Sequence, residues 1–398
     1  MKWEKKTLDE LGTVGRGRSK HRPRNDPKLF GGKYPFIQTA DVKNANFYII
    51  NFSSTYNEEG LAQSKLWPAG TLCITIAANI ADTGILAIPA CFPDSIMGFV
   101  ANEKIADTRF VKYCFDVLQK ECKQISQGTA QDNLSWEKLS TIKFLVPPLQ
   151  TQKRIASILS AYDDIIENNQ KQIKLLEEAA QRLYKEWFVD LRFPGHESVK
   201  IVDGVPEGWK KVRLDEVTSV LKRGISPKYD ENGEFTVINQ KCIRKNIVDY
   251  SESRKQSKKY AEELQLQESD TVICSTGIGT LGRVGQIYNV YQNSTFDSHV
   301  TLVRANKLIG KQFLFWSLKL LQPYLMSLGK GSTNQQELYK SDLTACFLLV
   351  PEEYIMNAFE RQAQELHDII AVKTKQISSL REARDRLLPK LMSGEIEV

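Results

Sequence analysis

The chain has few cysteines and no long apolar run. Its 398 residues include seven cysteines, an odd number with no Cys-x-x-Cys pair. This argues against a disulfide framework and a zinc site, and for a reducing compartment. No stretch of about 18 apolar residues is present that could span a membrane. The opening MKWEKKTLDEL lacks the apolar core of a signal peptide. We therefore expect a cytoplasmic protein.

A convincing set of catalytic residues is also missing. Gly277–Gly282 fits the dinucleotide-binding pattern, but a strand-like run follows it where a helix is needed, so a glycine-rich hairpin is expected. Residues 93–94 with 121–123 loosely resemble a nuclease pattern. Its carboxylates should lie on adjacent strands to hold a metal, but the second part falls at the end of a predicted helix, so chance explains the match better. Asp297–His299 are neighbours in sequence, which does not make a triad. No phosphate-binding loop occurs. We expect neither catalysis nor a metal site.

The balance of charge is mildly basic. Lysine and arginine total 54 against 48 aspartate and glutamate, which gives a net charge of +6 and a pI near 8.7. This permits an anionic partner without proving one. The hydrophobic content of 41% supports real cores, and the length favours two or three domains.

Glycine and proline are absent from residues 152–190, where apolar residues recur at steps of four and three. This a/d seam predicts a coiled-coil helix roughly 50 Å long, since a helix rises 1.5 Å per residue. The polar Asn169 in its middle would fix the register. The seam residues are Ile155, Leu159, Tyr162, Ile166, Asn169, Ile173, Leu176, Ala180, Leu183 and Trp187.

A second seam lies 204 residues later, near the C-terminus. Asp164-Ile165-Ile166 correspond to Asp368-Ile369-Ile370, and Lys373 takes the place of Asn169. We expect the two helices to pack antiparallel, with Asn169 and Lys373 meeting near one layer and Ala180 opposite the end that carries Phe359 and Ala363. The second seam consists of Phe359, Ala363, Leu366, Ile370, Lys373, Ile377, Leu380, Arg384, Leu387 and Leu391.

The repeat extends beyond the helices. WEKKTLDEL at 3–11 matches WKKVRLDEV at 209–217, FLVPP at 144–148 matches FLLVP at 347–351, and Asp94-Ser95 is matched to Asp297-Ser298. An internal duplication follows, with two halves of about 200 residues related by a pseudo-two-fold axis. The predicted fold class is α+β: two tandem α/β domains separated by two long helices that form an antiparallel coiled coil. The segments are domain 1 (1–147), helix 1 (148–192), a linker (193–204), domain 2 (205–350) and helix 2 (351–398).

Within each domain, β-branched and aromatic runs predict strands. Each domain should also hold a single helix near its end, at 106–124 and at 310–328. The predicted strands are 36–37, 47–51, 70–76 and 85–88 in the first half, and 235–238, 270–275, 283–288 and 300–303 in the second.

Recognition chemistry is concentrated in irregular polar segments. Both halves place basic residues after the same predicted strand, where they could neutralise DNA phosphates, while amides could read base edges. A solvated loop and a polar turn remain the alternatives. The candidate DNA-binding residues are Arg16, Arg18, Lys20, Arg22, Arg24, Gln127, Thr129 and Gln131 in the first half, and Lys222, Arg223, Lys228, Lys241, Arg244, Lys245, Ser332, Thr333, Asn334 and Gln335 in the second; a basic run at 254–259 follows.

These segments together resemble a known family. Five features carry the likeness: VPEGW at 205–209, Trp-x-x-x-x-Leu-Asp-Glu at 3–10 and 209–216, GTAQDNL and GSTNQQEL near the domain ends, VPPLQTQKRIASILSAYDDIIENN at 146–169, and LYKEWFVDLRFPG at 183–195. Over nearly its whole length the chain is similar to specificity (S) subunits of type I restriction-modification systems. It departs from the pattern at Met356, which stands where Gln152 stands in the first half.

The resemblance implies a function. Each domain would be a target-recognition domain that reads one half of a bipartite, asymmetric double-stranded DNA site. The helices would set the spacer and dock two methyltransferase (M) subunits, which bind S-adenosylmethionine and methylate adenine. Restriction (R) subunits would add cleavage that depends on ATP and Mg. The S subunit itself would carry no cofactor and no catalytic residue.

Two other functions stay open. The chain could be a coiled-coil adaptor whose domains bind proteins, in which case binding should not fall steeply with salt as phosphate-dominated binding does. It could also be a self-contained restriction-methylation enzyme, against which the missing motifs argue.

Overall fold

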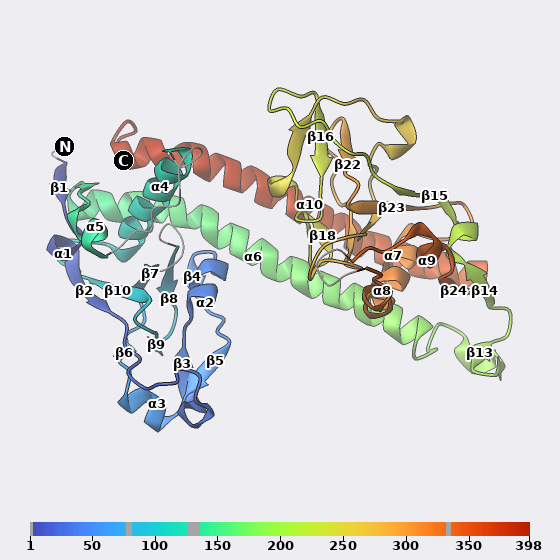
Figure 1. Ribbon diagram of the computed structural model, residues 1–398, viewed down its shortest axis with the longest axis horizontal. Helices are drawn as coiled ribbons and strands as arrows, with labels where there is room; N and C mark the ends of the chain where they lie inside the picture. Colours follow the sequence, from blue (N-terminus) through green and yellow to red (C-terminus); the bar gives the residue numbers. More distant parts are fainter. Residues whose placement is uncertain (1–2, 77–81, 126–135, 332–335) are drawn as a thin grey trace. The chain divides into compact units, whose positions relative to one another are not determined.

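The computed structural model describes residues 3–76, 82–125, 136–331 and 336–398. The chain divides into two compact units (Figure 1). Unit 1 combines Met1–Asn168 with Ile377–Val398, and unit 2 is Asn169–Gln376. Helices α6 (Leu149–Phe188) and α10 (Glu353–Ser393) each contribute to both units. No helix in the described ranges has the length and apolar content that a membrane span requires.

Unit 1 is built on a five-stranded sheet with the order β2-β10-β7-β8-β4. Neighbouring strands are antiparallel except β8 and β4, which are parallel. Helix α4 (Thr108–Ile125) contacts β8. The strands are β2 (Gly12–Arg16), β10 (Ile96–Ala101), β7 (Leu72–Thr75), β8 (Thr83–Leu86) and β4 (Tyr48–Ile49).

Smaller elements complete unit 1. A second sheet has the order β5-β3-β9-β6, and β1 pairs with β11 beside the start of α6. These elements are β5 (Ser54–Tyr56), β3 (Phe30–Phe36), β9 (Ala90–Cys91), β6 (Leu66–Trp67), β1 (Glu4–Lys6), β11 (Phe144–Val146), α1 (Leu8–Leu11), α2 (Thr39–Asn44), α3 (Glu58–Ala62) and α5 (Trp136–Thr141).

Unit 2 repeats this topology. Its main sheet has the order β15-β23-β20-β21-β18-β17, and helix α7 contacts β21 as α4 contacts β8. A smaller sheet β19-β16-β22 and the pair β14-β24 match their counterparts in unit 1. The main strands are β15 (Thr218–Arg223), β23 (Val300–Ala305), β20 (Thr271–Cys274), β21 (Val284–Gln286), β18 (Ile247–Val248) and β17 (Ile243–Arg244). The others are β19 (Arg254–Gln256), β16 (Phe235–Ile238), β22 (Ser294–Phe296), β14 (Lys210–Arg213) and β24 (Phe347–Val350), with helices α7 (Lys311–Leu320), α8 (Gln322–Ser327) and α9 (Lys340–Thr344). The predicted duplication and α+β class are confirmed.

The backbone register corrects one part of the sequence alignment. Gly17 N donates to Ile96 O, and Gly224 N donates to Val300 O. Ile96 therefore corresponds to Val300, and Ser95 corresponds to His299. The match of Asp94-Ser95 with Asp297-Ser298 was wrong by one residue, because identical letters in a loop outweighed the strand register.

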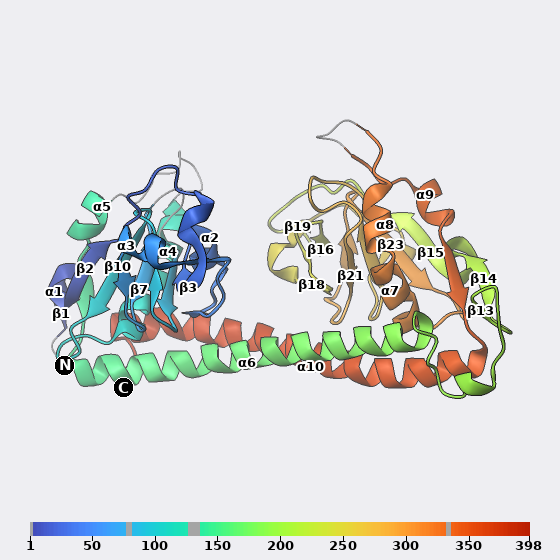
Figure 2. The same ribbon diagram turned by 90° about the horizontal axis from the view of Figure 1, so that it is seen from below.

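Helices α6 and α10 run antiparallel within each unit, as Figures 1 and 2 both show. In unit 1, Arg384 pairs with Asp163. In unit 2, the rings of Trp187 and Phe359 have centroids 6.0 Å apart. Ala180 lies in one apolar cluster with Phe359 and Ala363, as expected. The side-chain partner of Asn169 is Gln376, three residues after Lys373: Asn169 Nδ2 donates to Gln376 Oε1 at 3.3 Å.

The seam positions face inward to different degrees. Ile155, Leu159, Ile166, Asn169, Ile173, Trp187, Ile370, Ile377 and Leu391 are buried; Tyr162, Leu176, Leu183, Leu366, Lys373, Leu380 and Leu387 are half-buried. The seam joins each domain core as well as the partner helix: Ile155 and Leu159 pack with Leu388 and Leu391 in the core of unit 1.

One expectation about regular structure was wrong, and one was right. The single helix at 310–328 is two helices, α7 and α8, because Pro323 stands in the first turn of α8. The linker holds a strand, β12 (Ile201–Val202), which pairs with β13 (Val205–Pro206). Asp203 and Gly204 join them with positive φ values of 50° and 77°, as a two-residue hairpin needs. Gly277–Gly282 does join two antiparallel strands, β20 and β21, in a hairpin.

Candidate nucleic-acid interface

The basic segment of unit 1 follows β2 and is fixed at both ends by Asp94. Arg16 Nε donates to the backbone oxygen of Asp94 at 2.6 Å, and Arg24 forms an ion pair with its carboxylate at 2.7 Å. Between them, Gly17 packs so closely on the chain that an added Cβ would lie 2.2 Å from Pro93 O. The segment is therefore an ordered loop.

Helix α3 and its C-terminal end hold the middle of this loop. Gln63 Oε1 accepts from the backbone N–H groups of Lys20 at 2.6 Å and His21 at 3.0 Å, and Ser64 Oγ donates to Arg18 O. Arg22 donates to the backbone oxygens of Ser19 and His21. The side chains of Arg18 and Lys20 are exposed. A fixed backbone with exposed cations suits phosphate contact.

Three of the basic candidates in unit 2 face carboxylates. Lys222 pairs with Glu263 at 2.6 Å, Arg223 with Glu337 at 3.2 Å, and Arg244 with Glu252 at 3.5 Å. Such partly exposed ion pairs contribute at most about 1 kcal/mol, so a phosphate could replace the carboxylate. Lys228, Lys241 and Lys245 are exposed, the last with a positive φ of 57°.

Unit 2 also brings together polar residues that sequence reasoning missed. Thr276 Oγ1 lies 2.6 Å from His299 Nδ1 and 3.3 Å from Gln240 Oε1. Gln240 and Thr276 each come two residues after a strand, β16 and β20. Thr276 is bridged to Glu337, which is bridged in turn to Lys330. The cluster thus links the glycine hairpin to Lys330 and Glu337. The sequence signal that could have found this cluster is that Gln240 and Thr276 each follow the end of a strand.

Seven candidates fall outside the described residues, so the structure places none of them. They are Gln127, Thr129 and Gln131 of the first half, and Ser332, Thr333, Asn334 and Gln335 of the second.

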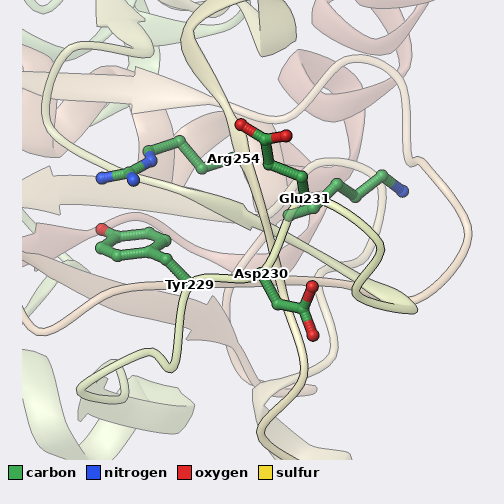
Figure 3. A pocket seen from close by; sticks show the side chains of 5 residues that line it. Tyr229, Asp230, Glu231 and Arg254 are labelled. Atoms are coloured by element: carbon green, nitrogen blue, oxygen red, sulfur yellow. The ribbon is translucent and has the colours of Figure 1, made fainter. Parts of the chain in front are cut away.

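A pocket of about 380 Å³ opens on unit 2 (Figure 3). It is lined by Tyr229, Asp230, Glu231, Arg254 and Lys255. The Arg254 guanidinium lies over the Tyr229 ring, 3.5 Å from its centroid. Arg254 lies in the basic run at 254–259, whereas Tyr229 was not predicted, because the two residues are 25 positions apart and only strand pairing brings them together.

One group in the described part of the chain has the spacing of metal ligands: Glu268, His367 and Asp368 place ligand atoms within 4.8 Å of one another. The buried His367 ring stacks on Tyr288 at 4.6 Å and lies 3.3 Å from the Gln364 amide nitrogen. Burial lowers the pKa of His367. We assign this group to anchoring α10 on the domain. Six cysteines, Cys73, Cys91, Cys114, Cys242, Cys274 and Cys346, are buried and free.

Comparisons with known proteins agree with this arrangement. A family model described as the type I restriction modification DNA specificity domain matches residues 1–178 and again 206–374. The chain is 26% identical over its full length to the specificity subunit of the type I restriction enzyme MjaIX of Methanocaldococcus jannaschii, and covers 94% of that protein. It is 24% identical over 91% of its length to the HindI specificity subunit of Haemophilus influenzae, and again covers 94%.

A solved structure shares the fold. The S subunit of a type I restriction-modification system from M. genitalium superposes with a TM-score of 0.57 at 17% identity, and the alignment covers 98% of this chain and 96% of that one. The two matched regions of the family model coincide with the two repeated halves.

Proposed function

The chain belongs to the type I restriction-modification DNA specificity family and is the specificity subunit of such a system; from this premise we propose that its two domains each read one half of a bipartite DNA site. The observation that carries the proposal is the repeated topology with unlike surfaces. Unit 1 presents the loop fixed by Asp94, whereas the equivalent edge of unit 2 carries His299, Gln240 and the pocket at Tyr229. Unlike surfaces read unlike sequences, so the two half-sites should differ.

The long helices would set the distance between the half-sites. Helix α6 passes from unit 1 into unit 2 at Asn169, and α10 passes back at Ile377, each as one continuous helix. Two weak readers joined by a stiff connection engage DNA together only at one spacing. The spacer is therefore proposed to be fixed.

The same helices would dock two methyltransferase subunits. Ile165 and Ile369 occupy equivalent positions of the repeat and are 50% and 45% exposed, and Leu175 and Val372 are more exposed still. Exposed apolar side chains on a charged helix are suited to partner contact. Two equivalent positions fit two M subunits. S-adenosylmethionine, ATP and Mg would bind to the M and R subunits, this chain would be non-catalytic, and the complex would act on DNA in the cytoplasm.

Methylome sequencing tests the proposal. A host without adenine methylation receives this chain with its methyltransferase partner, and a control host receives the partner alone. We expect a methyladenine motif only with both, made of two unequal parts around a fixed gap. Complex formation without any motif that depends on this chain would favour a protein adaptor instead.

A length change tests the role of the helices. One heptad inserted at matched layers of α6 and α10 adds about 10 Å, which equals roughly three base pairs. The spacer should lengthen by that amount and both half-sites should stay the same. A heptad in α6 alone serves as the control and should abolish methylation, because the seam loses its register. A changed half-site in the double insertion would contradict the model.

A further inference from the structure

Arg254 and Tyr229 form an exposed stacked pair beside the pocket of unit 2 (Figure 3). The guanidinium lies 3.5 Å from the ring centroid, and Tyr229 keeps 41% of its surface exposed. Stacking on an aromatic face restricts an arginine to one plane while its edge N–H groups stay available. The pair therefore presents a flat, oriented set of donors to the solvent.

Backbone pairing on both sides fixes this geometry. Strand β19 pairs with β16, which places Arg254 opposite Val237. On its other edge, Tyr229 is bridged to Gln256, Asp230 N donates to Lys255 O at 3.1 Å, and Ser257 N donates to Lys228 O at 2.9 Å. The Gln256 side chain is fully buried and bonds both backbone groups of Lys258. A reading group needs such support from rigid elements.

Arg254 differs from the other arginines of domain 2. Four of them pair with carboxylates: Arg213 with Asp215, Arg223 with Glu337, Arg244 with Glu252 and Arg304 with Asp270. Arg283 donates to two backbone oxygens. Within the described ranges of domain 2, Arg254 is the arginine that has neither kind of partner. Its side chain contacts Tyr229 instead, so its donors would displace no carboxylate and no backbone oxygen on binding DNA.

The charges around the pocket exclude a simple phosphate site. Arg254 and Lys255 are balanced by Asp230 and Glu231, so the lining has no net positive charge to attract a phosphate. Donors beside acceptors instead match the major-groove edge of a G·C pair, where guanine offers O6 and N7 as acceptors and cytosine offers the N4 amino group as a donor.

We propose that Arg254, held flat on Tyr229, donates to O6 and N7 of a guanine in the half-site of unit 2, while Asp230 or Glu231 accepts from N4 of a cytosine. This rests on the proposed function and names one specificity-determining residue within it. It requires at least one G·C pair in that half-site.

The test compares the DNA motifs that are methylated when the full chain, as wild type or as a variant, is expressed with its methyltransferase partner. Arg254→Gln removes the bidentate fork, and Arg254→Lys keeps the charge but not the fork. In both, one G·C position of one half-site should become degenerate, with discrimination there reduced roughly 5- to 150-fold. The other half-site should not change. Lys259→Gln removes a nearby exposed charge outside the pocket and should leave the motif intact.

The possible outcomes separate this inference from the proposed function. If the wild-type complex writes no motif, the proposed function fails. If it writes one and both Arg254 variants write the same one, the inference alone is overturned. If Arg254→Gln writes nothing, the purified Arg254→Lys complex is titrated with duplexes that carry each base pair at every G·C position. A preference equal to wild type at all positions also overturns the inference.

Discussion

Units 1 and 2 fix their domains to the long helices with different chemistry at equivalent positions. Asp163 of unit 1, which is 8% exposed, accepts from Tyr113 Oη at 2.6 Å and pairs with Arg384. Its counterpart 204 residues later is His367, which stacks on Tyr288 instead. The counterpart of Arg384 is Ala180, buried among apolar side chains.

The difference shows what the repeat must keep. Both positions carry a buried polar group that contacts an aromatic residue of the domain, but only unit 1 has the charge pair. Burial and the nearby Asp163 raise the pKa of Tyr113, and burial raises that of Tyr288. The stability of unit 1 should therefore depend on the charge pair of Asp163 and Arg384, whereas the stability of unit 2 should depend on the stacked rings of His367 and Tyr288.

A second pair of anchors differs in the same manner. Gln152 of α6 is buried, accepts from Asp107 N and donates to the backbone oxygens of Ile105 and Pro147 at 2.9 Å each. The equivalent Met356 lies in the apolar core of unit 2. One turn later, Glu360 accepts from Phe313 N at 2.6 Å and holds the start of α7. The departure at Met356 is thus compensated by a neighbour.

Removing the charge pair should have the largest effect. Arg384→Ala leaves Asp163 buried with Tyr113 as its remaining partner, and should destabilise unit 1 by about 3 kcal/mol. Hydrogen-exchange mass spectrometry would measure this, with protection lost in peptides of unit 1 and kept in those of unit 2. The control Arg386→Ala removes an exposed i,i+4 pair with Glu382 and should change protection by less than about 0.5 kcal/mol. Equal losses in both units would contradict the assignment.

Making the helix starts alike should have a smaller effect. Gln152→Met gives unit 1 the residue of unit 2 but leaves buried backbone groups unpaired, at a cost of about 2 kcal/mol. The reciprocal Met356→Gln should bring no gain, because Glu360 already holds α7. Thermal unfolding followed by peptide-resolved exchange would compare the two. If Gln152→Met is neutral, the hydrogen bonds of Gln152 do not fix α4.

A third expected effect depends on pH and belongs to unit 2. Burial raises the pKa of Glu177 to about 7, against partial lowering by Asn246 and Lys245, and its Oε1 has no hydrogen-bond partner in the described structure. The folded chain therefore holds this proton more tightly than the unfolded chain. Unit 2 loses stability as pH rises from about 4.5 to 7.

Glu177→Gln should remove that dependence. At pH 8 the variant should be more stable than wild type by up to about 3 kcal/mol, which is what a pKa raised from 4.5 to about 7 corresponds to, and at pH 4.5 the two should match. Urea unfolding at both pH values, read from exchange in unit 2, measures the difference. Glu178→Gln, a neighbour on the more exposed face, is the control. A difference that grows as pH falls would have the wrong sign.

The long helices were predictable because a/d spacing is a local pattern of the sequence. The duplication was predictable because segments repeated at an offset of 204 residues can be recognised by comparing the sequence with itself. The hydrogen bond from Asn169 to Gln376 was not predicted, because a/d spacing does not say which side chains on two helices contact each other. The strand at Ile201–Val202 was missed because it depends on the φ values of Asp203 and Gly204.

The site was predicted less well than the fold. The DNA-binding role of the basic segments stays a prediction, and the carboxylates that face Lys222 and Arg223 were not predicted, because they are 41 and 114 residues away. In the sequence, Arg254 belongs to a charged run that looks like a solvated loop. Only the structure shows that β19, the strand that carries Arg254, is paired on both edges. Such pairings are tertiary and leave no local pattern in the sequence.

The division of the helices has a consequence for synthesis. Leu388, Leu391 and Met392 belong to the core of unit 1, although they lie almost 400 residues along the chain from its first strand. A ribosome releases the whole of unit 2 before it supplies these residues, so the first domain to be translated is the last to be completed. Until then its core is open, and a chaperone that shields it would have to wait through the synthesis of the second domain.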